Sequence, residues 1–169
     1  MKILETSAKW KVKEEKPIAV WEMEVEGRVA IKASNTINVP YEKCQEFFRD
    51  PVFMKSLQDN VVKMEVVWNK NDVRVIHGVM KMPGPVSNRE LVAVNTFKVE
   101  GDKTYVGNRS LKNFPVQAEK DTERAHLHVG GFIFEKVDAG KTKVTNISDM
   151  DPKGSIPGFV KNALASKRA

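Results

Sequence analysis

Three histidines are the most obvious potential metal ligands in this sequence. His126 and His128 stand two residues apart and so share one face of a predicted strand, while His77 falls on another strand. Two or three imidazoles can bind zinc, but catalytic zinc sites need three protein ligands and no cysteine accompanies these histidines. We therefore interpret them as ordinary sheet-surface side chains, and we predict neither a metal nor another cofactor.

Enzymatic chemistry lacks recognisable parts in this chain. The sequence shows no nucleophile motif, paired acidic dyad or phosphate-binding loop. Some folds catalyse reactions with scattered polar residues, so the lack of a motif does not by itself exclude an enzyme. The favoured interpretation is a protein that is not an enzyme.

Asn95 is a polar residue in an otherwise apolar run, which makes it a candidate for ligand binding. If its side chain faces inward, the buried amide needs a hydrogen-bonding partner, and a ligand could provide it. An edge-facing asparagine is an equally good interpretation. Methionines in or beside predicted strands could line an adaptable apolar cavity, or could simply fill gaps in the core. These methionines are Met64, Met80, Met82 and Met150.

Apolar residues that alternate with polar ones predict that most of the chain forms antiparallel strands joined in hairpins. Two short helices are expected after the first hairpin, one opening at Pro40 and a second following Pro51. The pair Gly130-Gly131 predicts a bulge or a sharp bend inside a long strand. The predicted strands span residues 19–25, 28–39, 61–68, 73–82, 91–99, 104–110, 125–137 and 143–148.

An amphipathic helix is predicted at the end of the chain, with Ser155 as its cap and Pro157 in its first turn. A curved antiparallel sheet laid around this helix would bury its apolar side. The expected architecture is therefore an α+β fold in a single domain that spans residues 1–169. The apolar side consists of Ile156, Phe159, Val160, Ala163 and Leu164.

Composition and charge narrow the classes of partner and compartment. The net charge of +6 is spread along the chain, without the basic patch and interleaved aromatics typical of a nucleic-acid surface. A single cysteine, Cys44, permits no intrachain disulfide, and no apolar run approaches the length of a membrane span. We expect a cytoplasmic protein that does not bind nucleic acid.

Three motifs in order resemble those of one known family. Residues 81–90 read KMPGPVSNRE, residues 128–133 read HVGGFI, and residues 151–157 read DPKGSIP. In this order and at these distances they resemble the StAR-related lipid-transfer (START) family, over about residues 8–164. The resemblance implies a helix-grip fold, in which a sheet wraps around the C-terminal helix and a lipid-sized cavity lies between them.

The resemblance also implies roles for individual residues. Family members carry one sterol, phospholipid or ceramide, and their C-terminal helix and a loop before the last strands form a gate at the membrane. Arg89 matches an arginine near the ligand's polar end, although a salt bridge that anchors the loop 83–88 is the alternative. The predicted ligand-binding residues are Arg89, Asn95, His77, Met80, Phe159 and Leu164. The predicted gate comprises Pro115, in the loop 112–122, with Ile156, Phe159 and Val160.

The leading hypothesis is a protein that binds one apolar ligand, such as a sterol, a phospholipid or another small lipid, and could transfer it within the cell. Basic residues in the predicted last helix could make transient contact with an anionic membrane. The alternative is a non-catalytic subunit of a larger assembly, with protein partners and a filled cavity. A short last helix and the lack of most of the family's N-terminal helix favour that alternative. The basic residues are Lys161, Lys167 and Arg168.

Overall fold

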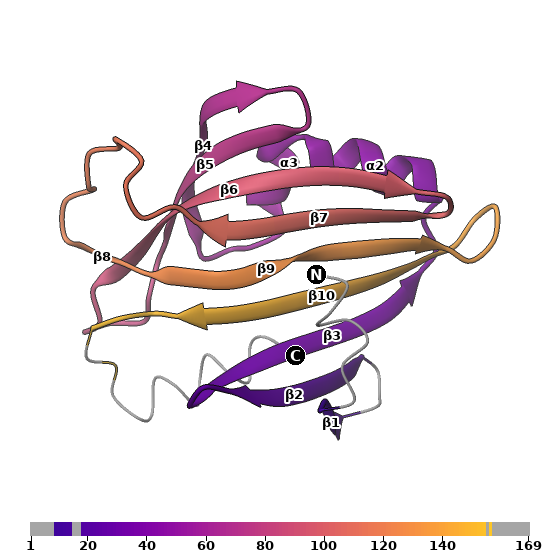
Figure 1. Cartoon of the computed structure of the whole chain (residues 1–169), viewed down its shortest axis with the longest axis horizontal. Coiled ribbons are helices and arrows are strands. Elements are labelled where there is room, and N and C mark those ends of the chain that lie inside the picture. The colour runs from indigo at the N-terminus through magenta and orange to yellow at the C-terminus, as the bar shows by residue number, and fades with distance from the viewer. Residues whose placement is uncertain (1–8, 15–17, 155, 157–169) are drawn as a thin grey trace.

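The computed structural model describes residues 9–14, 18–154 and 156, and within them most of the chain forms one curved antiparallel sheet (Figure 1). Its strands are neighbours in the order β1-β2-β3-β10-β9-β7-β6-β5-β4. The short β8 pairs in parallel with the start of β6. The strands are β1 (Lys11–Glu14), β2 (Ala19–Val25), β3 (Arg28–Ile37), β4 (Val61–Lys70), β5 (Val73–Met80), β6 (Asn88–Glu100), β7 (Lys103–Ser110), β8 (Thr122–Arg124), β9 (His126–Lys136) and β10 (Thr142–Asp151).

The predicted hairpins are confirmed, but two of their turns are shorter than expected. The β4–β5 turn contains only Asn71 and Asp72, because β4 continues pairing as far as Lys70, two residues beyond its predicted end. Asn71 adopts a φ of 54°, a left-handed conformation that asparagine tolerates in a two-residue hairpin turn. The β6–β7 turn is likewise reduced to Gly101 and Asp102.

The two predicted helices are confirmed as α2 (Tyr41–Arg49) and α3 (Pro51–Ser56). Asp50 separates them, and its carboxylate accepts a hydrogen bond of 2.8 Å from the Val52 N–H at the start of α3. This contact satisfies one of the N–H groups that a helix start leaves without an internal partner.

Helix α2 packs on one face of the sheet, which we call the helix-side face. The Tyr41 hydroxyl lies 2.7 Å from the Thr104 hydroxyl of β7. The Phe48 ring lies 4.7 Å from that of Phe132 and 4.5 Å from that of Phe134, both in β9. Residues paired directly across an antiparallel ladder share a face, so the register extends this assignment to every strand that continues the ladder. The other side of the sheet is the opposite face.

The glycine pair in β9, where a bulge or a sharp bend was predicted, marks a close approach of two strands. Gly131 has a φ of 135°, and a Cβ atom there would lie 1.8 Å from the Val106 carbonyl oxygen of β7. Only glycine fits this position. The β9–β10 register then shifts at Asp149, so the sheet carries an irregularity close to the predicted one.

Two strands were not predicted. Edge strand β1 reads KVKE and is exposed throughout, so it carries little hydrophobic signal. Strand β8 begins at the end of the predicted loop 112–122 and reads TER, which has no apolar alternation. It is a strand because β6 extends past the end of β7 and leaves an edge to which residues 122–124 pair.

The predicted C-terminal helix lies outside the described residues, except for Ile156. That side chain is buried and packs with Met82 and Val86. Among the helices that the structure describes, neither is long and apolar enough to cross a membrane.

Candidate functional site

The helix-side face combines apolar side chains with incomplete burial. Along β5, the opposite-face residues Val75, His77 and Val79 are buried, whereas the helix-side residues Ile76 and Met80 are partly exposed. Strand β10 repeats this contrast from Val144 onward, whereas in β6 and β7 the helix-side residues Asn95 and Val106 are buried. The face is therefore apolar and still partly accessible, although α2 packs on it. Its partly exposed apolar residues include Ile31, Ala33, Ile76, Met80, Leu91, Phe97, Phe132 and Val144.

Asn95 lies near the middle of β6 on this face, and its side chain points inward. It is only 3% exposed. Its Oδ1 atom accepts a 2.6 Å hydrogen bond from Arg74 Nε, and its Nδ2 atom donates a 2.7 Å bond to Asn108 Oδ1. Arg74, Asn95 and Asn108 are directly opposed in β5, β6 and β7, so they form one polar row across the sheet.

Arg74 anchors this row to the end of α2. Its NH1 and NH2 atoms donate to the carbonyl oxygens of Arg49, at 2.6 Å, and Phe48, at 3.1 Å. Burial lowers the pKa of Arg74 and repulsion from Arg49 adds to this, while Asp50 opposes it. A guanidinium nevertheless stays protonated in proteins. The cation therefore binds the helix end and Asn95 together.

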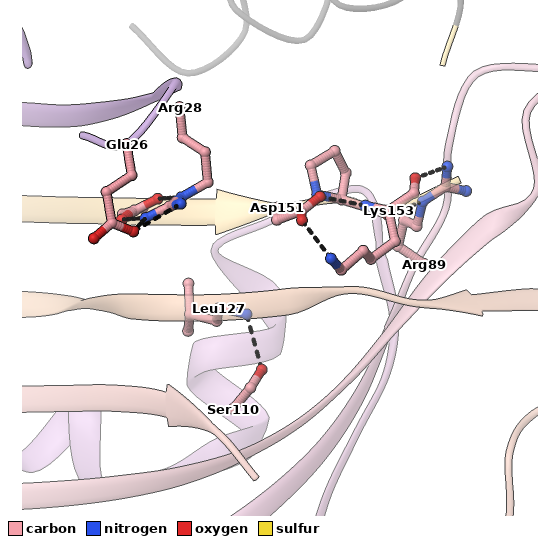
Figure 2. A network of polar contacts seen from close by, with 9 residues as sticks. Glu26, Arg28, Arg89, Ser110, Leu127, Asp151 and Lys153 are labelled. Atoms are coloured by element: carbon pink, nitrogen blue, oxygen red, sulfur yellow. Dashed lines mark hydrogen bonds and ion pairs between the residues drawn. The ribbon is translucent and has the colours of Figure 1, made fainter. Parts of the chain in front are cut away.

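Arg89 reaches across to the segment that follows β10. The side chain is 2% exposed, and its guanidinium donates to the carbonyl oxygens of Pro152 at 2.6 Å, Lys153 at 3.0 Å and Ser87. Figure 2 shows the contact with Lys153. These bonds join the loop 83–88 to the chain that leads into the predicted gate. The anchor uses backbone carbonyls rather than the salt bridge that was the alternative interpretation.

The remaining predicted residues divide into three groups. Met80 lies on the helix-side face with Asn95 and Arg89, whereas His77 lies on the opposite face. In the predicted gate, Pro115 is exposed and Ile156 is buried. Phe159, Val160 and Leu164 lie outside the described residues. The ligand-binding and gating roles stay predictions.

A second polar cluster, which the sequence analysis missed, surrounds Glu90 on the opposite face. Glu90 is 1% exposed and accepts bonds from Arg124 Nε at 2.7 Å and from the Glu119 N–H at 3.0 Å. The His77 imidazole, 2% exposed, completes it with Nε2 3.1 Å from a Glu90 oxygen. Lys63 forms an ion pair with the carboxylate of Glu119. The connection between β7 and β8 is therefore held to the sheet through both the N–H and the side chain of Glu119.

Glu90 is ionised in this setting. Burial acts to raise its pKa, but the hydrogen bonds from the Glu119 N–H, Arg124 and His77 together outweigh burial, so the pKa lies below the ordinary value. The sequence signal that could have revealed this cluster is the alternation of Val75, His77 and Val79, which places His77 among buried side chains. A buried imidazole requires a polar partner.

His126 and Cys44 also have shifted pKa values. The rings of His126 and His128 lie 4.5 Å apart, and burial, followed by His128, lowers the pKa of His126. Burial also raises the pKa of the Cys44 thiol, which keeps it protonated and poorly nucleophilic. Among the described residues, no group of three or more His, Cys, Asp or Glu side chains could hold a metal ion.

Comparison with known proteins gives a consistent family. The model of the START domain matches residues 2–169. START domain-containing protein 10 of human and of mouse are each 24% identical over 126 residues, which is 74% of this chain and 43% of the relative. The chain thus spans less than half the length of these relatives.

Solved structures show the same fold. Human STARD10 superposes with a TM-score of 0.86 at 24% identity, over 97% of this chain and 71% of that one. Human StAR-related lipid transfer protein 5 also superposes with a TM-score of 0.86, at 16% identity, over 98% of this chain and 85% of that one. The Zhui aromatase/cyclase of a Streptomyces species superposes with a TM-score of 0.56 at 11% identity, over 81% of this chain and 82% of that one. These likenesses confirm the predicted fold class.

Proposed function

Because this chain belongs to the START domain family, we propose that it binds a single apolar ligand on the helix-side face of its sheet. The ligand would be a sterol, a phospholipid or another small lipid. Transfer of that ligand between membranes is the finer part of the proposal. It draws on the name of the lipid transfer protein that shares the fold.

The partly exposed apolar helix-side face, with a buried amide in its middle, carries this proposal. A face that only served as a core would be closely packed and shielded from water. Ligand sites instead combine a mainly apolar lining with a few convergent polar groups. Ile76, Met80 and Leu91 provide such a lining, and Asn95 with Asn108 provides the polar groups.

A carrier fits this face better than an enzyme does. The polar side chains in its middle, Asn95, Asn108 and Ser110, are neutral amides and a hydroxyl, and their cross-strand partners among the described residues include no general base. The aromatase/cyclase shares the fold at low identity, so the fold alone does not decide the matter. The family match favours ligand binding over the alternative of a structural subunit.

Native mass spectrometry tests the proposal directly. The protein is purified, mixed with a cellular lipid extract, and weighed under conditions that retain non-covalent ligands. We expect one lipid per chain, released on denaturation. A chain that retains no lipid from any extract would contradict the proposal.

A matched pair of variants locates the site. Ala33 and Ala19 are both partly buried, but Ala33 lies on the helix-side face and Ala19 on the opposite face. Ala33→Trp should reduce lipid retention by filling space over the sheet, whereas Ala19→Trp should leave it unchanged. Equal retention by the two variants would place the ligand elsewhere.

A further inference from the structure

The polar row on the helix-side face has a defined direction. Arg74 can only donate hydrogen bonds, so the Asn95 atom that it contacts at 2.6 Å must be the carbonyl oxygen. Asn95 Nδ2 then faces Asn108, whose carbonyl oxygen accepts the next bond. The order of donors and acceptors is thereby fixed along the row, and it leaves Asn108 Nδ2 at the far end.

The Asn108 side-chain nitrogen carries two N–H groups that can still donate hydrogen bonds. It makes no hydrogen bond with any described residue, and Asn108 is partly exposed. Among the described residues, no side-chain nitrogen or oxygen is both fully buried and without a partner. The amide N–H groups are therefore accessible from the space over the sheet.

Ser110 adds a second donor on the same strand and face. It lies two residues beyond Asn108, about 7 Å away between Cα atoms. Its Oγ atom accepts a 2.8 Å bond from the Leu127 N–H (Figure 2). That bond uses the oxygen and leaves the hydroxyl proton free to donate.

Among the described residues, the side chains that flank this pair on the same face are apolar or neutral, and Ser148, which is opposed to Gly130, is one of the neutral polar ones. Ser110 is opposed by Ala93, a small apolar side chain that is buried. Asn108 is opposed by Gly130, where a Cβ atom would lie 3.1 Å from the Leu127 side chain, so Leu127 covers that position. The charged group nearest along the row, Arg74, already binds three acceptors. The pair thus offers neutral donors in a weakly polar setting, which suits a neutral acceptor better than an anion.

We propose that the Asn108 amide and the Ser110 hydroxyl together bind a carbonyl oxygen of the ligand. The ligand is then an apolar molecule with an ester, amide or ketone carbonyl, such as an acyl lipid. This inference rests on the proposed function, because it specifies the chemistry of the same face.

Two lipids that differ only in their carbonyl groups provide the test. Vesicles are loaded with dioleoylglycerol or with its dioleyl ether analogue, and the amount extracted by the protein is measured at equilibrium. The wild-type protein should prefer the ester by about tenfold, the effect of roughly one buried hydrogen bond. Equal extraction of both lipids would overturn the carbonyl site and leave the proposed function intact. If neither is extracted, both proposals fail for this ligand class.

Asn108→Asp is the most informative variant. The new carboxylate can still accept the bond from Asn95, but it lacks N–H donors and repels a carbonyl oxygen. It should abolish the preference for the ester, so that the extracted amounts of ester and ether become equal. The same substitution at the exposed Asn69 should change neither. A retained preference in Asn108→Asp would overturn the assignment to these residues.

Discussion

Strands β5 and β6 carry two buried polar clusters on opposite faces, and the clusters differ in completeness. Around Glu90, the carboxylate is 1% exposed and accepts from Arg124, from His77 and from the Glu119 N–H. Around Asn95, the row begins at a cation with three acceptors and ends at the Asn108 amide nitrogen, which has no hydrogen-bond partner among the described residues. The Glu90 carboxylate is therefore saturated by protein donors, whereas the row through Asn95 ends in N–H groups that can still bind an acceptor.

The two clusters also differ in the hydrogen-bonding groups that they offer to a ligand. The Glu90 cluster ties the connection between β7 and β8 to the sheet, and both oxygens of the Glu90 carboxylate already accept hydrogen bonds from the protein. The row through Asn95 faces the side on which α2 packs, beside apolar residues that stay partly exposed. Binding is therefore expected on one face only, and the variants below test that division.

Loss of the Glu90 carboxylate should have the largest effect on stability. Glu90→Ala would leave Arg124, His77 and the Glu119 N–H without their shared acceptor, and we expect the free energy of unfolding to fall by about 3 kcal/mol. Urea denaturation measures this change. Glu65→Ala, which removes an exposed carboxylate paired with Lys63, is the control and should cost less than about 1 kcal/mol. A similar cost for both variants would mean that the cluster does not stabilise the fold.

Disruption of the row through Asn95 should cost less. Asn95→Leu would leave Arg74 Nε and Asn108 Oδ1 unpaired, but Arg74 retains its two bonds to α2, so we expect a loss of about 2 kcal/mol. The same variant should also weaken lipid binding, which Glu90→Ala should not do in the folded protein. Thermal unfolding and lipid extraction from vesicles, measured in parallel, separate the two effects. Unchanged lipid binding in Asn95→Leu would remove the row from the site.

The Glu90 cluster should also make stability depend on pH. Because the pKa of Glu90 is lower in the folded protein than in the unfolded chain, ionisation stabilises the fold above the unfolded value, about 4.3 for glutamate. This contribution should disappear as the pH falls below that value towards the folded pKa. Denaturation of the wild type and of Glu90→Gln at pH 7, 5 and 3 should show a smaller loss in the variant. Parallel curves would contradict a depressed pKa.

The smallest effect is expected at the surface. On α2, Lys43 Nζ lies 2.8 Å from Glu46 Oε2, and more than half of each side chain is exposed. An exposed pair of this kind contributes about 0.5 kcal/mol or less, so Lys43→Ala should leave the denaturation midpoint nearly unchanged. A loss comparable to that of Asn95→Leu would show that burial is not what separates strong from weak polar contacts here.

Sequence patterns predicted the fold well because local signals determine most of it. Pro40 and Pro51 mark the starts of the two helices, and Glu26-Gly27 marks the turn between β2 and β3, as in the structure. Strand β8 could not be predicted in this way, because its pairing depends on where two other strands end. The inward position of Asn95 was one of two interpretations, and the register decided between them.

The site was predicted less completely, for a physical reason. His77 and Asn95 were both singled out as polar residues on strands, but alternation alone does not say which face is accessible. Their partners Glu90 and Asn108 lie 13 residues away in each case and become neighbours only through strand pairing.

Side-chain amide resonances offer the most direct test of the division between the faces. In a ¹⁵N-labelled sample, the amide groups of Asn95 and Asn108 should shift when lipid is added from vesicles. The Glu90-bound N–H of Glu119 and the exposed side chain of Asn69 should not shift. Shifts confined to the opposite face, or none at saturating lipid, would contradict the account.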